Sequence, residues 1–417
     1  MEINKKKPAA LIAVLICLII TVSATSCGKE SQSVNTEPPP SPTDTIDEAP
    51  PPDTPPDTPP PPAQPSYTPT FPAPGQELVP YDGAVEHIFF HEVIAYPELA
   101  FSGSSRQKGY DDYMVTVSEY IKILESLYRN NYILVSMNDV WSEYSDENGT
   151  QRMRRNTLML PEGKKPLIIS FDDINFYEYM HSDGFMQKLI IGEDGEIWTT
   201  GADPDGNTVV TQDLAAVPIL DKFVKDNPDF SMYGVKGCIA LTGYEGILGY
   251  RTQNDRNNDS AEFRLNRMQE IARVRPVIDR LKKTGWYFAS HSYGHISLDT
   301  SSFDSVSADA ARWMDEVGPL VGETQIFIYP FGSRLDGNDV NSTGPAFRFY
   351  HDLGFRLFAS VGYEPFSLIK TDIAAVVCDR MNVDGIALRR SREQYLRFYD
   401  AREVFDPMRP AEYGIGW

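Results

Sequence analysis

Seven short apolar runs alternate with more polar stretches between residues 81 and 417. Most runs have four or five residues and are apolar on both faces, which is typical of strands in a buried parallel sheet. We therefore expect a parallel sheet whose strands come from the whole length of this region. The runs are 87–90, 133–135, 167–170, 286–289, 326–329, 357–359 and 374–378.

The stretches between these runs carry apolar residues at spacings of three and four, which is typical of amphipathic helices. The clearest cover 113–129 and 263–282, and weaker patterns cover 307–320 and 344–353. Within the second stretch, Pro276 predicts a kink because proline removes a backbone donor. Strands that alternate with helices predict an α/β fold, either a (β/α) barrel or a doubly wound sheet.

Residues 1–26 have the features of a secretion signal. Lysines at 5–7 precede an apolar run over 9–24, which is shorter than the roughly 20 apolar residues that cross a bilayer. Small residues directly precede Cys27, which resembles a bacterial lipoprotein signal, although Ala24 stands where that pattern prefers leucine. The resemblance implies that Cys27 is lipidated and anchors the chain to the extracytoplasmic face of the cell membrane. A plain signal peptide or a short anchor helix is the alternative.

Residues 27–80 have the composition of a tether. Between 37 and 80 lie 18 of the chain's 32 prolines, and little there is apolar enough to offset the entropy of ordering. We expect an extended spacer of about 3.1 Å per residue where it adopts polyproline II. Residues 81–417 are long enough for one large α/β domain, and the stretch at about 192–258, rich in Gly, Asp, Asn and Thr, is interpreted as an insertion.

Charge and cysteine content exclude some classes of protein. A formal net charge of −21 argues against a nucleic-acid partner, because phosphate binding needs clustered lysine and arginine. Four cysteines do not suggest a disulfide framework. Once the signal and lipidated residues are set aside, Cys238 and Cys378 remain, either as a pair or as two buried thiols. We expect a monomer.

Candidate chemistry lies where the apolar runs end. Asp172 and Asp173 follow the third run, His291 and His295 follow the fourth, and His91 follows the first. Because parallel strands place their carboxyl ends at one common edge, these groups are expected to converge. Each signal alone has an ordinary explanation, since paired aspartates form turns and single histidines often lie in loops or cores. The combination favours a shared site.

These segments carry a resemblance to a known family. The segments 170–173 (SFDD) and 291–295 (HSYGH) resemble the first two motifs of NodB-type polysaccharide deacetylases, carbohydrate esterase family four, and 329–332 (YPFG) resembles the third. The resemblance implies a distorted (β/α) barrel that removes N-acetyl groups from a polysaccharide with the help of a metal ion. It covers most of 81–417, apart from the insertion.

By this resemblance Asp173, His291 and His295 are the metal ligands, and Asp172 is the general base. Zn²⁺ accepts such a mixture of imidazole and carboxylate, and Co²⁺, Ni²⁺ or Mn²⁺ would suit the same ligands. The backbone N–H of Phe331 is the expected donor to the oxyanion that forms on the acetyl group. Tyr329 and Tyr293, which lie within these motifs, are expected near the substrate.

The chain departs from the family at three positions. No histidine follows His351, whereas the family's general acid is a histidine in a late motif. His91, in the segment 89–93 (FFHEV), resembles the opening histidine of poly-N-acetylglucosamine deacetylases, whose barrel is circularly permuted; His91 is either this acid or a structural residue. Isoleucine at 328 replaces an arginine that orients the base, and Ile174 replaces a common glycine.

Arg380, after the last apolar run, could supply the missing guanidinium, although it could equally pair with Asp379 or Asp384. Two functions remain open. One is a hydrolase acting on N-acetylglucosamine units of an exopolysaccharide or of peptidoglycan, and the other is a surface lipoprotein that keeps the fold only to bind glycan. Retention of Asp172 beside all three ligands favours the enzyme, because binding alone needs no base.

Overall fold

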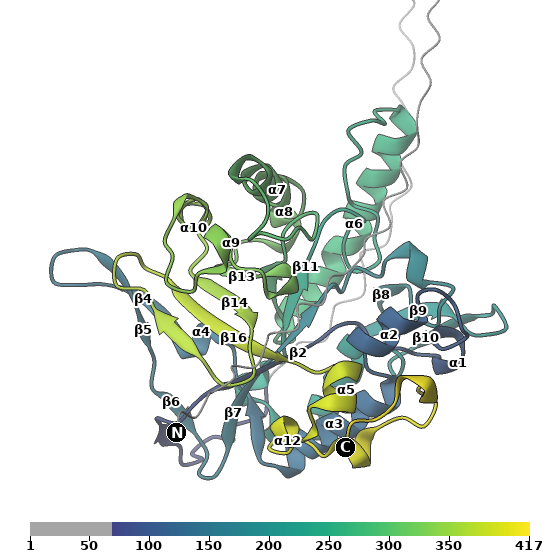
Figure 1. The fold of residues 1–417 in the computed structure, drawn as a ribbon, viewed down its shortest axis with the longest axis horizontal. Helices are drawn as coiled ribbons and strands as arrows, with labels where there is room; N and C mark the ends of the chain where they lie inside the picture. Colours follow the sequence, from purple (N-terminus) through teal and green to yellow (C-terminus); the bar gives the residue numbers. More distant parts are fainter. Residues whose placement is uncertain (1–68) are drawn as a thin grey trace, which may run out of the picture. The chain divides into compact units, whose positions relative to one another are not determined.

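The computed structural model describes residues 69–417 (Figure 1). The predicted signal peptide, the lipidation site at Cys27 and residues 27–68 of the predicted tether lie outside these residues and stay predictions. The predicted end of the tether at 80 is wrong, because Val79 and Pro80 pair with Leu160 and Met159 in a small sheet. Within 69–417, no helix combines the length and the apolar character needed to cross a bilayer.

Within the described part of the chain, seven parallel strands close into a barrel. The pairing runs from β2 through β7, β11, β12, β13, β14 and β16 and returns to β2, so the ring has no free edge. The predicted fold, a distorted (β/α) barrel, is confirmed, whereas circular permutation stays a prediction. The strands are β2 (Glu86–Phe90), β7 (Lys165–Asp172), β11 (Cys238–Leu241), β12 (Tyr287–Ser290), β13 (Ile326–Ile328), β14 (Leu357–Val361) and β16 (Val376–Asn382).

Smaller strands extend this framework. β3 (Tyr132–Leu134) pairs with the first residues of β7, and β15 (Ser367–Ile369) runs antiparallel to β16. Three small antiparallel sheets complete the set. They are β1 (Val79–Tyr81) with β6 (Leu158–Leu160), β4 (Trp141–Ser145) with β5 (Gln151–Arg155), and β8 (Lys188–Ile191) with β9 (Ile197–Ala202) and β10 (Thr208–Thr211).

Helices cover the outside of the barrel (Figure 1). The helix predicted over 113–129 is α3, which begins with a capping box between Thr116 and Glu119. The helix predicted over 263–282 is α6, which runs through Pro276 as one helix. The longer helices are α2 (Gln107–Tyr113), α3 (Val117–Arg129), α5 (Ala216–Asp226), α6 (Ala261–Lys283), α7 (Phe303–Glu316), α10 (Pro345–Asp352) and α11 (Gly385–Arg390). The short ones are α1 (Pro97–Ala100), α4 (Met137–Val140), α8 (Gly318–Val321), α9 (Leu335–Asn338), α12 (Arg392–Tyr395) and α13 (Ala401–Val404).

Alternate strand residues divide between two cores, as the period of two requires. One set, including Ile88 and Phe327, packs against the helices. The other set, including Ala240, Ala289 and Ala359, forms a separate cluster and therefore fills the barrel. Cys238 and Cys378 belong to this interior as free buried thiols.

The prediction of an insertion over about 192–258 is wrong in its second half. Residues 188–211 do form a separate three-stranded sheet, but the chain then builds α5 and the barrel strand β11. β11 pairs with β7 on one side and with β12 on the other, so the ring cannot close without it. The polar and glycine-rich composition around this strand concealed a core element.

Candidate metal centre

Three side chains from two distant segments meet at the carboxyl ends of the strands. Asp173 follows β7, and His291 and His295 follow β12. One potential ligand atom from each lies within 4.8 Å of the others. Nε2 of His295 is 3.5 Å from Oδ2 of Asp173, and the two imidazole rings are 5.0 Å apart between centroids. The predicted ligand set is therefore assembled by the fold.

The backbone at this site adopts conformations that L-residues usually avoid. Asp173, Ser292, His295 and Phe331 all have positive φ, at 59°, 56°, 51° and 57°. Each such residue costs about 1–3 kcal/mol, so the surrounding structure must impose the conformation. The Asp309 carboxylate does so for the histidine loop by accepting hydrogen bonds from two consecutive backbone N–H groups after Ser292. Two of these four residues, Asp173 and His295, present potential ligand atoms.

Hydrogen bonds orient the ligand side chains. Nδ1–H of His291 donates to the carbonyl of Ile328 over 2.9 Å, which leaves the Nε2 lone pair free for a metal ion. Burial lowers the pKa of His291 and so favours the neutral ring. The phenol of Tyr177 donates to Oδ1 of Asp173 over 2.6 Å and lies 2.7 Å from Oγ1 of Thr242. These residues fit a divalent transition metal, because two imidazoles and one carboxylate are its usual ligands.

Asp172 is held by an arginine from β16, the second strand from β7 around the ring. Nη1 and Nη2 of Arg380 donate to its two carboxylate oxygens over 2.8 and 3.0 Å, and both side chains are almost fully buried. Burial alone would raise the pKa of Asp172, but Arg380 and the nearby His291 outweigh it and hold the pKa far below its usual range. The alternative partners are engaged elsewhere, since Asp379 pairs with Arg334 and Asp384 caps α11.

His91 lies beside this pair at the end of β2. Its Nδ1–H donates to the carbonyl of Tyr113 over 2.9 Å, which leaves Nε2 available. Phe90 and Phe171 are paired neighbours on β2 and β7, so His91 and Asp172, one residue further along, lie side by side. The side chain of His91 is partly exposed, as a proton donor to a substrate must be.

The third motif places one side chain at the site and buries another. The ring of Phe331 is 57% exposed and stands 4.3 Å from the ring of His295 between centroids. Tyr329, predicted near the substrate, is instead buried among Phe327 and Phe358. Tyr329 follows Phe327 by two residues, so its side chain points to the same outward face of the barrel.

The prediction for Tyr293 is also wrong. Its ring is buried, its hydroxyl donates to Glu316 over 2.8 Å, and the guanidinium of Arg312 lies 4.1 Å from the ring centroid. Because Ser292 turns the backbone, the residue between the two histidines points away from them toward α7. Neither tyrosine offers a surface to a polymer.

Sequence reasoning pointed to Tyr244 as an aromatic residue that could border the cleft, but it missed Tyr177 and Tyr179. Tyr177 is buried and stacks with Tyr179 and with Tyr244, at centroid distances of 5.8 and 5.1 Å. Tyr179 and Tyr244 are 46% and 38% exposed. Residues 173–177 are not helical, so their spacing did not predict this contact, and the approach of Tyr244 depends on the loop after β11.

No protein-family model and no curated protein sequence matches the chain. Solved structures that are similar include the deacetylase PplD of Streptococcus pyogenes in complex with acetate, at 15% identity and a TM-score of 0.38, over 74% of this chain and 94% of that one. BC0361, a polysaccharide deacetylase from Bacillus cereus, is similar at 11% identity and a TM-score of 0.38, over 72% of this chain and 65% of that one. The solved structures similar to this barrel thus include a deacetylase and a polysaccharide deacetylase.

Proposed function

We propose that this chain removes N-acetyl groups from a polysaccharide that contains N-acetylglucosamine, with the help of a divalent metal ion. The observation that carries the proposal is the meeting of Asp173, His291 and His295 beside an ion-paired Asp172. Three ligands with an adjacent carboxylate base are an arrangement that can hydrolyse an amide with the help of a metal ion.

The three ligands would hold Zn²⁺, or Co²⁺, Ni²⁺ or Mn²⁺, and the chemistry that such an ion supplies is polarisation of a carbonyl and activation of water. The chain's own residues determine where the proton goes. Asp172 lies with Oδ2 3.9 Å from Nε2 of His291, so its carboxylate borders the ligand cluster and is placed to accept a proton from the attacking water. Arg380 keeps both oxygens of Asp172 in place and keeps the carboxylate ionised.

Two further groups are assigned roles in this proposal. His91 donates a proton from Nε2 to the departing amine, because an amide anion is too basic to leave unprotonated. The backbone N–H of Phe331 stabilises the oxyanion on the acetyl carbon, which requires a donor fixed in advance. The left-handed backbone of Phe331 supports this role, since it turns the peptide at the edge of the ligand cluster.

Exposed aromatic rings support a sugar polymer as the substrate. Tyr179 and Tyr244 lie on one side of Asp173 through their stack with Tyr177, and Phe331 lies beside His295. Flat aromatic faces pack well on the apolar faces of pyranose rings. We extend the proposal to a location at the cell membrane, reached through the lipid on Cys27, where exopolysaccharide and peptidoglycan are both accessible.

The test is release of acetate from N-acetylglucosamine oligomers by the full chain loaded with Zn²⁺. We expect acetate release that a chelator abolishes and that Asp172→Asn reduces by at least a thousandfold while the metal content stays unchanged. His91→Ala should reduce turnover with intact metal binding. Lack of acetate release from β-linked oligomers of any linkage, with the metal fully bound and the oligomers bound, would favour the glycan-binding lipoprotein instead.

A further inference from the structure

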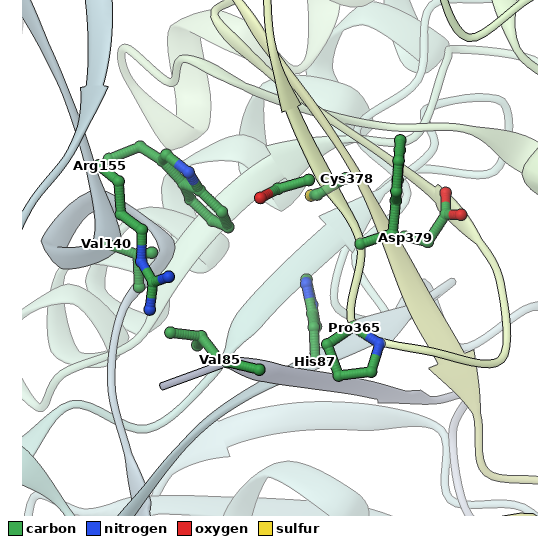
Figure 2. Close-up of a pocket in the computed structure, with 11 residues that line it drawn as sticks. Val85, His87, Val140, Arg155, Pro365, Cys378 and Asp379 are labelled. Carbon is green, nitrogen blue, oxygen red and sulfur yellow. The ribbon is translucent and has the colours of Figure 1, made fainter. Parts of the chain in front are cut away.

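A pocket opens near the amino end of β2, and its wall contains none of the residues that carry the proposed function. Its wall contains His87, Trp141, Arg155, Cys378 and Asp379, and its volume is about 270 Å³. In Figure 2, His87 rises from its strand between Arg155 on one side and Cys378 and Asp379 on the other. The pocket therefore reaches the barrel interior from the end opposite the metal centre.

Two buried side chains in this wall have nitrogen atoms without a partner. Nδ1 of His87 and Nε1 of Trp141 make no hydrogen bond within residues 69–417, although the two side chains are only 5% and 7% exposed. Most buried polar groups are paired, so two orphans in one wall require an explanation. A bound molecule that supplies the hydrogen-bond partners missing from the protein would explain both.

The hydrogen bonds of Ser170 indicate that His87 offers a donor. Oγ of Ser170 accepts from Nη1 of Arg380 over 3.0 Å and lies 3.0 Å from Nε2 of His87. The arrangement that satisfies all three groups has the Ser170 hydroxyl donating to Nε2, which places the His87 proton on Nδ1. Indole nitrogen is always a donor. Both orphans are therefore N–H groups.

The charges around the pocket favour an anionic acceptor. Arg155 brings a guanidinium to the wall, while the carboxylate of Asp379 is already neutralised by Arg334. Two N–H groups and one cation match the two oxygens of a carboxylate. Val85, Val140 and Phe366 add an apolar surface on which a short hydrocarbon chain can pack.

We propose that this pocket binds a small organic carboxylate, held by Nδ1–H of His87, Nε1–H of Trp141 and the guanidinium of Arg155. The site is separate from the ligand cluster of Asp173 and does not depend on the proposed deacetylase activity. The volume admits a molecule with a few carbon atoms beyond the carboxylate, since liquid water occupies about 30 Å³ per molecule.

The experiment follows the indole N–H resonance of Trp141 in the full chain, labelled with ¹⁵N-tryptophan and assigned with Trp141→Phe. Butyrate is the probe, and 1-butanol is the uncharged comparison. We expect a saturable movement of this resonance across millimolar butyrate and none with butanol. His87→Phe, which keeps the bulk and removes the donor, should weaken butyrate binding by at least about tenfold.

Two further variants keep the test decisive if His87→Phe fails to fold. Arg155→Gln should weaken butyrate binding severalfold, whereas Arg154→Gln, an exposed neighbour on the same strand, should leave it unchanged. The movement should persist in Asp173→Ala, which separates this site from the metal centre. Absence of a saturable movement, an equal response to butanol, or loss of the response in Asp173→Ala would each overturn the proposal.

Discussion

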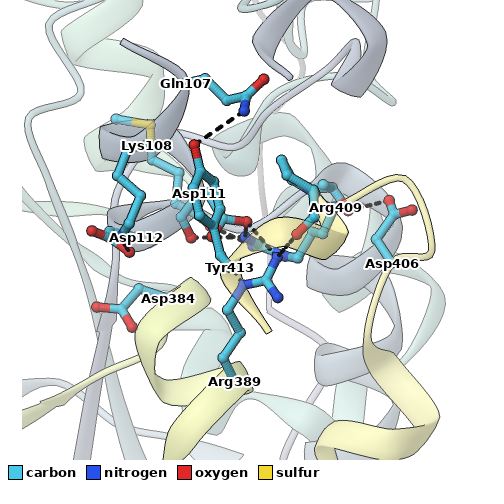
Figure 3. A network of polar contacts seen from close by, with 12 residues as sticks. Gln107, Lys108, Asp111, Asp112, Asp384, Arg389, Asp406, Arg409 and Tyr413 are labelled. Carbon is cyan, nitrogen blue, oxygen red and sulfur yellow. Dashed lines mark hydrogen bonds and ion pairs between the residues drawn. The ribbon is translucent and has the colours of Figure 1, made fainter. Parts of the chain in front are cut away.

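Replacing Arg409 with methionine should destabilise the fold more than any surface substitution. Arg409 is fully buried in a network that joins the end of the chain to α2 and α3 (Figure 3). Nε and Nη2 donate to the Glu119 carboxylate over 2.6 and 2.8 Å, and Nη1 donates to Oδ1 of Asp111 over 3.0 Å. Nη1 and Nη2 also donate to the carbonyls of Asp111 and Met114. All five N–H groups of the guanidinium are used.

The size of the effect follows from what the substitution leaves behind. Asp111 retains a two-pronged pair with Arg389, at 2.9 Å for both contacts, so its charge stays compensated. Glu119 keeps backbone donors from Thr116 and Asp406 but loses its only cation in this network. An uncompensated buried charge costs about 3–5 kcal/mol. We expect a loss of this order in the free energy of unfolding.

The substitution also reaches the candidate site through the backbone. Arg409 fixes the carbonyls of Asp111 and Met114, and Tyr113 between them accepts the hydrogen bond from His91. Loosening this segment should let the His91 ring change orientation. We therefore expect turnover to fall even at temperatures where Arg409→Met remains folded.

The assay is urea unfolding of the full chain at pH 7, followed by tryptophan fluorescence. Arg390→Met is the matched control, because Arg390 is exposed and should change stability by less than about 0.5 kcal/mol. The double variant Arg409→Met with Glu119→Gln should recover about 1 kcal/mol or more, since it removes the buried charge. A loss below about 1 kcal/mol in the single variant, or no recovery in the double variant, would refute the reasoning.

Three further predictions concern residues near the site. Tyr177→Phe removes the hydrogen bond to Asp173 and should weaken metal binding by about 10–100-fold by calorimetry, with Tyr128→Phe as a control. Chelation should lower the unfolding temperature of the metal-loaded wild type but not of His291→Ala, because a ligand that binds only the native state stabilises it. Burial raises the pKa of Glu92 to about 7, above its value in the unfolded chain. Between about pH 4.5 and 7 the unfolded carboxyl therefore loses its proton before the native one does. The free energy of unfolding should fall by up to about 3 kcal/mol over this range and then level off. Glu92→Gln should remove this decline. If the free energy of unfolding of the variant depended on pH as that of the wild type does, the assignment to Glu92 would be wrong.

Most of the barrel was predictable because its strands are short, buried and apolar on both faces. The predicted runs at 87–90 and 167–170 are now β2 and β7, and the remaining five also became strands. β11 was not predicted as a strand, because its four residues show no alternation of apolar and polar positions and lie between Gly237 and Gly243 in a polar stretch. Its identity as a strand comes from pairing with β7 and β12, which is a long-range property.

The convergence of the ligands was predictable for a different reason. Parallel strands share a carboxyl edge, so residues after β7 and β12 had to approach each other. The direction of each side chain was not predictable in the same way. Tyr293 and Tyr329 sit within the motifs, yet a positive φ at Ser292 and the strand alternation of β13 turn them into the core.

Closure of the ring explains how residues from opposite ends of the chain serve one site. β2 is the first barrel strand in the sequence and β16 is the last, yet they are paired neighbours, with Ile88 opposite Met381. His91 at the end of β2 lies beside Asp172 on β7, because Phe90 and Phe171 are paired one residue earlier. Arg380 on β16, the strand on the other side of β2, reaches the same carboxylate with its guanidinium. In a closed barrel, the first and the last strand of the sequence can be direct neighbours in the ring. A histidine near the start can then occupy the place that a late motif would fill, because strand order around the ring decides which groups meet.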